Sequence, residues 1–316
     1  MITLNDVAKK AKVGKSTVSR VLNNSNSVSK EAREKVLKAI DELDYHPSNA
    51  ARSLKTFNSY NIGFIMDNTI DKAYANPFIY EEFRGIEKVI YENGYNMLLF
   101  GKDTYQNGIL AVEAALKGKS VDGLILPSDL IISGYYEKLK KFNIPIVSLG
   151  QLENNFDLSW VDIDNRMAGY LATKYLYSRG YKNISFLGID ENKIFASERY
   201  KGYVKFLKEI GLEEQNFSET LQNIDSLVCL DNIYAHKALN ICKNLNKDVP
   251  NEIGIITFDN YPLAEYLEPS ITNIDINLFE LGKHVGQEII RKVKKKEGDI
   301  KNIKIPASVN IMNSTK

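Results

Sequence analysis

The sequence is poor in the residues that build disulfide frameworks and metal centres. Of its 316 residues, two are cysteine, three are histidine and one is tryptophan. Cys229 and Cys242 stand in apolar surroundings, and neither they nor the scattered histidines match a metal-ligand spacing. We therefore expect reduced core thiols in a cytoplasmic protein, without a metal or another cofactor.

Long apolar runs are also missing. No stretch of 18 apolar residues occurs, and the first residues lack the apolar region of a signal peptide. Neither secretion nor a membrane partner is expected. With 44% hydrophobic and 26% charged residues, the chain resembles an ordinary globular protein with room for two or three domains.

Motifs of common enzyme classes are lacking as well. The sequence contains no GxxxxGK[ST] phosphate loop, no GxGxxG and no GxSxG motif. An enzyme such as a sugar kinase is therefore the weaker interpretation, and turnover of ATP would revive it.

Charge is unevenly distributed along the chain. Residues 1–60 hold 11 Lys+Arg against 6 Asp+Glu and carry +5, whereas the remainder holds 30 against 34 and carries −4. A basic head on a mildly acidic body fits a head that binds a polyanion. A solvated charged surface would give the same balance, so charge alone does not decide between them.

The first 23 residues decide in favour of DNA. Apolar residues at 4, 7, 8 and 11 predict one helix, with Thr3 as its N-cap and Asp6 completing a capping box. A turn at 13–14 precedes a second helix that buries Val18 and Val21 and exposes polar and basic residues. Such a helix-turn-helix places its second helix in the DNA major groove.

The run TLNDVAKKAKVGKSTVSRVLN, from Thr3, resembles the head of the LacI/GalR family of bacterial transcription factors. Lys12 replaces the usual turn glycine, and Gly14 replaces the serine that usually caps the second helix. The stretch HPSNAARSL, at 46–54, resembles the family's hinge helix, and the resemblance implies that Leu54 wedges into the minor groove. A solvated linker is the alternative for the unbound protein.

From residue 61 onward, unalternated apolar runs alternate with helical stretches, which predicts parallel sheets covered on both faces. Signatures such as VDGLIL, R-x-x-G at Arg199 and Gly202, and IITFDN extend the resemblance over nearly the whole chain, nearest to regulators of maltose and other α-glucosides. The resemblance implies two Rossmann-like parallel-sheet subdomains of the type I periplasmic-binding-protein kind. The expected boundaries are 1–47 for the helix-turn-helix domain, 48–60 for the hinge, and 61–316 for the effector-binding and dimerisation domain, with one subdomain at about 61–157 and 278–302 and the other at about 158–277 and 303–316.

Ligands of such sheets bind beyond the carboxyl ends of the strands. Arg199 and Asp259 lie there and could instead pair with each other structurally. The resemblance makes both effector anchors and gives Asn76 and Phe78 the opposite wall, although a phenylalanine opening an apolar helix is often part of the core. Asp231 is a further candidate, beside Leu230, which replaces a usual asparagine.

The interpretation is a sugar-responsive repressor that binds a pseudo-palindromic operator in double-stranded DNA as a homodimer. The expected DNA contacts are Lys15, Ser16 and Arg20 to bases, Thr17, Ser19 and Asn23 to phosphates, and Asn49 and Leu54 from the hinge. Two alternatives remain open: a sugar-binding transport protein, and a corepressor-dependent regulator that responds to a non-sugar molecule.

Overall fold

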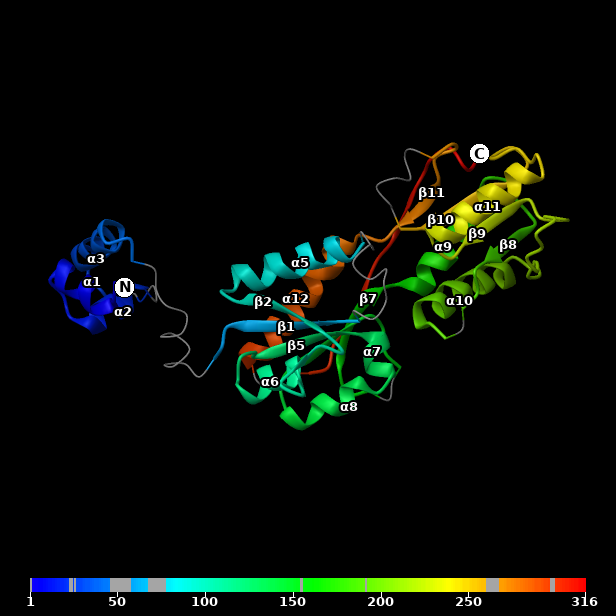
Figure 1. The fold of residues 1–316 in the computed structure, drawn as a ribbon. Helices are drawn as coiled ribbons and strands as arrows, with labels where there is room; N and C mark the ends of the chain where they lie inside the picture. The colour runs from blue at the N-terminus through cyan, green and yellow to red at the C-terminus, as the bar shows by residue number, and fades with distance from the viewer. Residues whose placement is uncertain are drawn as a thin grey trace. The chain divides into compact units, whose positions relative to one another are not determined.

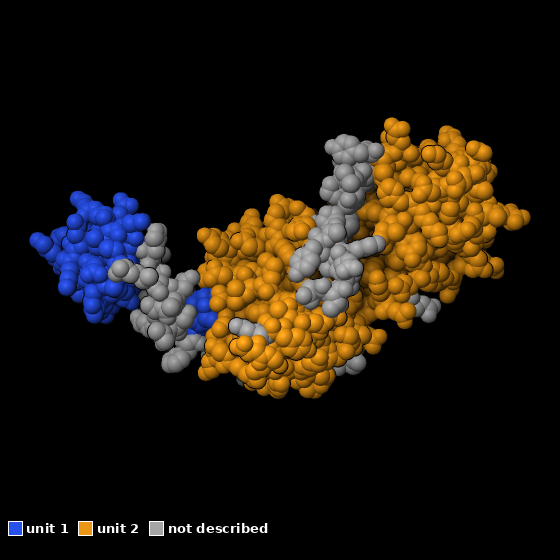
Figure 2. Space-filling model, viewed as in Figure 1, with its two compact units in different colours: residues 1–60 blue, residues 61–316 orange. Residues whose placement is uncertain are grey.

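The computed structural model describes residues 2–22, 25, 27–45, 58–67, 78–153, 156–190, 192–259, 267–295 and 299–316. The chain forms two compact units, residues 1–60 and 61–316, which Figure 2 colours separately. The expected hinge contacts at Asn49 and Leu54, and the expected contacts at Asn23 and Asn76, lie outside the described residues.

The described part of the first unit holds three helices, α1 at Leu4–Ala11, α2 at Lys15–Leu22 and α3 at Lys30–Glu42. The predicted capping box at Thr3 and Asp6 is present, and Ser29 caps α3 by accepting from Ala32 N at 3.2 Å. These caps satisfy amides that the first turns leave free. The apolar stripes meet in one small core lined by Val7, Ala8, Ala11, Val18, Val21, Val36, Ala39 and Tyr45.

Lys12 ends α1 in the left-handed region, at φ +52°. A side chain is strained there by about 1–2 kcal/mol, which glycine avoids. We expect Lys12→Gly to raise the free energy of local unfolding of α1 and α2 by about 1 kcal/mol. The greater flexibility that glycine gives the unfolded chain offsets part of this gain. Hydrogen exchange of these amides in the full chain measures the change. Faster exchange in the variant would contradict this account of the turn.

The first sheet of the second unit has six strands in the order β12-β7-β6-β5-β1-β2, all paired in parallel. Its strands are β1 (Asn61–Met66), β2 (Asn96–Gly101), β5 (Gly123–Pro127), β6 (Ile146–Leu149), β7 (Ser159–Ile163) and β12 (Asn302–Ile305). Helices α5 (Phe78–Glu92) and α12 (Leu278–Lys295) pack on one face, and α6 (Ala111–Lys117), α7 (Ser128–Ile132) and α8 (Tyr135–Leu139) on the other (Figure 1).

The second sheet has five strands in the order β13-β11-β10-β9-β8, and only the β11–β13 pair is antiparallel. Its strands are β8 (Ile184–Leu187), β9 (Ser226–Cys229), β10 (Gly254–Phe258), β11 (Thr272–Asp275) and β13 (Ser308–Asn310). Phe186 packs against Tyr200 and Tyr203 of α10 (Ile194–Glu209), which lies beside α9 (Asn165–Ser178). Leu187 shares the other core with α11 (Asn232–Asn244). The α/β body with two parallel-sheet subdomains is thus confirmed.

The chain crosses between the two sheets three times, and two crossings differ from the expected boundaries. β7 belongs to the first sheet, so the first crossing follows residue 163 and not residue 157. β12 also joins the first sheet, so the last crossing falls between residues 305 and 308 and not at 302. Each crossing begins at the carboxyl end of a strand: β7, β11 or β12. The parallel neighbours of these strands run in the same direction. The carboxyl ends of both sheets therefore face the crossings.

One helix begins later than expected, and the cysteines are as expected. The helix expected from about Asn107 begins at Ala111, after a short hairpin of β3 (Tyr105–Gln106) and β4 (Ile109–Leu110). Both cysteines are buried free thiols, as predicted. Within the described part of the chain, no helix combines the length and apolarity needed to cross a lipid bilayer.

Glycines let two helix pairs approach at backbone distance. A Cβ on Gly169 of α9 would lie 1.9 Å from the carbonyl oxygen of Arg199 in α10, and one on Gly202 would lie 2.0 Å from that of Arg166. In the first subdomain, a Cβ on Gly282 of α12 would lie 2.1 Å from the carbonyl oxygen of Glu82 in α5. Only glycine fits at such approaches. The glycines therefore set where Arg199 and Glu82 stand.

Candidate DNA-binding surface and strand-end cluster

Helix α2 presents a polar, basic face to solvent. Lys15, Ser16 and Arg20 are exposed, and Thr17 and Ser19 are partly exposed. Val18 and Val21 point into the head core and are buried, so the helix cannot rotate about its axis without losing that core. No acidic residue stands in the first turn of α2. This face can donate hydrogen bonds to phosphates and base edges without a carboxylate opposing them.

In the second unit, a hydrogen-bonded network joins the ends of strands from both sheets. Its centre is Arg199 on α10, which is 4% exposed. Arg199 Nε donates to Asn165 Oδ1 at 3.0 Å, and Nη1 donates to the Leu230 carbonyl at 2.8 Å. Asn165 Nδ2 donates in turn to Asp162 Oδ2 at 3.2 Å, at the end of β7. We call Asp162, Asn165, Arg199 and Asp259, together with Glu82, on whose carboxyl the charges of Asp162 and Asp259 act, the strand-end cluster.

Asp259 follows β10 directly and is held in a strained backbone conformation, at φ +75°. Its Oδ1 lies 3.5 Å from Arg199 Nη2, and it is a buried oxygen that accepts no hydrogen bond from the described residues. Burial raises the pKa of this carboxyl, and the charge of Arg199 opposes the rise. Strain and an unsatisfied acceptor at one residue are typical of a site built for a ligand.

The structure describes the other expected ligand contacts, Asp231 and Phe78, to different extents. Asp231 is the N-cap of α11, and its Oδ1 accepts from Ile233 N at 2.9 Å and Tyr234 N at 3.1 Å. The capping role therefore engages Oδ1 of Asp231. Phe78 opens α5, and the placement of its side chain lies outside what the structure describes. Arg199 and Asp259 do pair with each other, at 3.5 Å, which is the structural alternative proposed for both.

Three members of the strand-end cluster were not predicted from the sequence. Asn165 opens α9 directly after the β7 crossing, and the D-N pair at 164–165 is the signal that could have found it. Asp162 accepts from the amides of Gln151 and Ile163 at 2.9 and 2.7 Å. Glu82 comes from the other subdomain and is half-buried on α5. In the described ranges, no three His, Cys, Asp or Glu side chains gather as a metal site requires.

Glu82 is the carboxyl whose ionisation the cluster disfavours. Burial, followed by the negative charges of Asp162 and Asp259, raises its pKa from 4.5 to about 8. Between these two pH values the folded state keeps a proton that the unfolded state has released, so stability falls as pH rises through this interval.

Glu82→Gln cannot release a proton and should flatten that part of the stability–pH curve. Urea unfolding of both proteins across this pH range tests it, and parallel curves would contradict the assignment.

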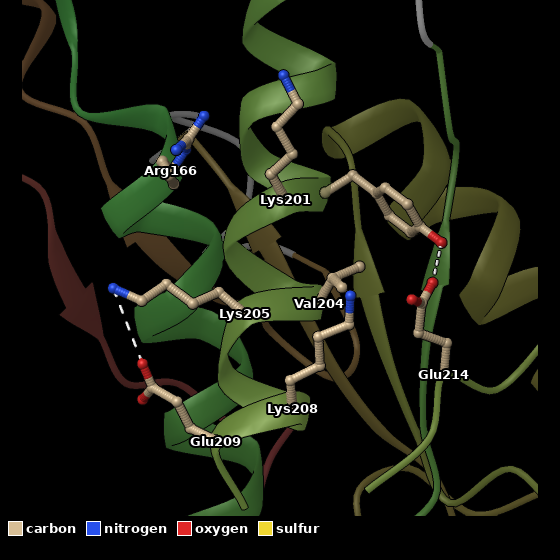
Figure 3. Close-up of a pocket in the computed structure, with 8 residues that line it drawn as sticks. Arg166, Lys201, Val204, Lys205, Lys208, Glu209 and Glu214 are labelled. Atoms are coloured by element: carbon tan, nitrogen blue, oxygen red, sulfur yellow. Dashed lines mark hydrogen bonds and ion pairs between the residues drawn. The ribbon is translucent and has the colours of Figure 1, made fainter. Parts of the chain in front are cut away.

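A second feature lies apart from the strand-end cluster. A groove of about 690 Å³ runs along α10, lined by Arg166, Tyr200, Lys201, Val204, Lys205, Lys208, Glu209 and Glu214 (Figure 3). Its charges mostly neutralise one another: Arg166 and Lys201 both bind Glu198, at 2.8 and 2.9 Å, and Lys205 lies 3.8 Å from Glu209. These are ion pairs with exposed cations, which contribute little. The groove is a solvated charged surface, without the buried polar atoms of the strand-end cluster.

Different protein-family models match the head and the body of this chain. The model of bacterial regulatory proteins of the lacI family matches residues 3–48, and that of periplasmic binding proteins and the sugar binding domain of the LacI family matches residues 59–226. A periplasmic binding protein-like domain matches residues 173–315. The chain belongs to the LacI family. It is therefore a DNA-binding transcriptional regulator with a helix-turn-helix head.

Relatives in the LacI family align over almost all of the chain. The ribose operon repressor of Halalkalibacterium halodurans is 33% identical over 332 residues, covering 100% of this chain and 98% of that protein. The HTH-type transcriptional regulator MalR of Streptococcus pneumoniae is 32% identical over 307 residues, covering 89% of this chain and 90% of that protein.

Solved LacI-family structures share the fold. A complex of the transcriptional regulator CelR with cellobiose has a TM-score of 0.69 at 24% identity and covers 99% of this chain and 100% of that one. The lac repressor dimer bound to operator and an anti-inducer has a TM-score of 0.74 at 20% identity and covers 99% of each chain.

Proposed function

We propose that this LacI-family regulator represses carbohydrate utilisation genes and that a small sugar, with maltose or another α-glucoside as the first candidate, changes its operator affinity. The observation that carries the proposal is the strand-end cluster, where a buried guanidinium meets the strained Asp259, whose buried Oδ1 accepts no hydrogen bond from the described residues. Paired sugar hydroxyls need planar donors and carboxylate acceptors of this kind. The family resemblance of the sequence favours an α-glucoside, and the relative that is a ribose operon repressor makes ribose a necessary comparison.

On DNA, we expect two subunits to present α2 to the halves of a pseudo-palindrome. Lys15, Ser16 and Arg20 occupy the exposed face that would meet base edges, and Thr17 and Ser19 flank it towards the phosphates. The proposed assignment also gives Asn23 a phosphate contact, and gives Asn49 and Leu54 contacts from the hinge.

In the body, Arg199, Asp259 and Asp231 would hold the sugar from the second subdomain, with Asn76 and Phe78 from the first. Closure of the two subdomains on the sugar would change the spacing of the paired hinges and so the affinity for the operator. A ligand can do this only if it binds the two states with different affinities. Induction, in which sugar weakens DNA binding, is the expected direction.

A sugar panel tests the proposal. The purified chain is mixed with a fluorescent operator, and maltose, other α-glucosides, cellobiose and ribose are titrated while anisotropy is followed. A sugar at 100 times its dissociation constant should also stabilise the body by about 2.7 kcal/mol in a thermal-shift assay. Release of the operator supports induction, and tighter binding means corepression. Absence of any effect of every sugar on both readouts would remove the sugar from the proposal.

A further inference from the structure

The two ends of the first sheet carry opposite charge. Its six strands run in parallel, so all of them begin at one end of the sheet, the amino end, where the chain enters β1 at Asn61. The described segments that lead into strands there hold eight lysines and four acidic residues: 92–95, 117–122, 140–145, 157–158, 292–295 and 299–301. The described segments that leave the strands at the carboxyl end hold one lysine and five acidic residues: 67, 102–104, 128–129, 150–153 and 164.

This excess of lysine is local to the amino end of the sheet. Residues 61–316 as a whole carry −4, so the body is acidic outside this region. A surface that is only solvated can mix both signs of charge and does not require them to separate along one sheet. A separated positive surface creates a field that attracts a polyanion.

The point where the chain arrives from the head lies beside these lysines. Asn61 Nδ2 donates to the Ser120 carbonyl at 3.0 Å, which brings Lys119 next to the start of β1. Lys294, in the last turn of α12, donates from Nζ to Asn93 Oδ1 at 2.6 Å, just before β2, the strand paired with β1. The basic surface and the connection to the head therefore share one end of the first subdomain.

Most of these lysines keep a positive charge that no carboxylate opposes. The partner of Lys294 is a neutral amide, which orders the side chain without cancelling its charge. Four further lysines are exposed and, within the described part of the chain, form no ion pair: Lys117, Lys119, Lys295 and Lys301. The lysines at 140–141 differ, because both bind acidic side chains. We call Lys117, Lys119, Lys294, Lys295 and Lys301 the amino-end lysines.

The covalent connection to the head keeps DNA within reach of this surface. Residues 46–60 join the two units, and fifteen residues span at most about 50 Å when fully extended. A duplex bound by α2 is thus held at high local concentration near the amino end of the sheet. Ammonium groups without a carboxylate partner can replace the counterions of its phosphates, and release of these counterions favours binding.

We infer that the amino-end lysines bind backbone phosphates of the duplex that the head holds, so that the body contributes directly to DNA affinity. Contacts of this kind position a protein on the duplex and carry no sequence information. The inference needs only the DNA binding of the head, and it does not depend on the effector. It adds a second DNA contact surface, in the unit that the sequence marks as acidic.

Lysine acetylation of the unaltered protein tests where DNA lies. The full chain is treated with an acetylating reagent with and without a saturating operator duplex, and the modified lysines are identified by mass spectrometry. The amino-end lysines should react more slowly on DNA, because a bound phosphate covers the ammonium group. Lys174 on α9 and Lys208 on α10 are exposed in the second subdomain and should react at the same rate in both samples.

A pair of double variants measures the contribution to affinity. One combines Lys119→Gln with Lys295→Gln, and its control combines Lys174→Gln with Lys208→Gln, which removes the same charge from the second subdomain. Anisotropy titrations with the operator at several KCl concentrations give the slope of log Kd against log salt. The first variant should lower this slope by about 2 for each bound subunit, and the control should leave it unchanged.

Two results would overturn the inference. Equal acetylation of the amino-end lysines with and without the duplex would show that no phosphate covers them. Equal salt slopes for the two double variants would show that only the net charge of the chain matters. The acetylation experiment uses the wild-type chain, so it decides the question even if a double variant does not fold.

Discussion

Replacing Arg20 with alanine is expected to weaken operator binding by about 1–3 kcal/mol, which is roughly tenfold to more than a hundredfold, and to relax the preference at one base pair in each half-site. Arg20 stands on the exposed face of α2, one residue from the buried Val21 that fixes the rotation of the helix. A guanidinium in the major groove pairs in bidentate fashion with the O6 and N7 atoms of guanine. Loss of the pair therefore removes discrimination as well as affinity.

The control removes the same charge elsewhere in the head. Lys38 lies on α3, is exposed and lies 3.9 Å from Glu42. Lys38→Ala should lower the affinity for all DNA sequences slightly and leave base preference intact. Anisotropy titrations against the operator and its single-base variants compare both proteins. If Arg20→Ala weakens every sequence equally, Arg20 binds a phosphate and does not read a base.

Gly169→Ala is expected to destabilise the body by about 2–3 kcal/mol, because a single methyl group would meet the backbone of the neighbouring helix. The new Cβ would stand 1.9 Å from the carbonyl oxygen of Arg199, so α9 and α10 must separate. Arg199 moves with α10 and leaves the positions from which it binds Asn165 and Asp259. The variant should therefore lose sugar affinity as well as stability.

Gly118→Ala is the matched control for this substitution. Gly118 ends α6 at φ −79°, and its added Cβ would approach no atom more closely than 3.3 Å. It should change stability by well under 1 kcal/mol. Urea unfolding of the full chain, with and without the sugar found in the panel, measures both effects. A Gly169→Ala protein as stable as the control would contradict the close helix approach.

The local features could be predicted from the sequence because a few adjacent residues determine them. Thr3 with Asp6 and Ser29 before α3 specify helix starts, and spacing alone orients α2 with Val18 and Val21 inward. The alternation of apolar runs and helices likewise predicted two parallel sheets. In each case the signal for a single helix or strand lies within that element or beside its first turn.

Features that depend on distant pairing could not be predicted in this way. A parallel strand such as β7 is largely buried whichever sheet it joins, so its sequence does not show on which side of the crossing it falls. Glu81 and Glu82 are adjacent, identical in kind and on one helix. Only the packing of α5 on α12 decides which of them is subject to the charges of Asp162 and Asp259. The resemblance to the family located Arg199 and Asp259 and did not reveal this acidic neighbour.

The most direct test of the whole account is selection of duplexes from a randomised library by the full chain, followed by anisotropy on the selected sequence with and without sugars. The account predicts a pseudo-palindromic site that binds about a thousandfold or more tightly than bulk DNA, and a neutral sugar that changes this affinity. Equal affinity for the selected sequence and bulk DNA, under every condition, would contradict it.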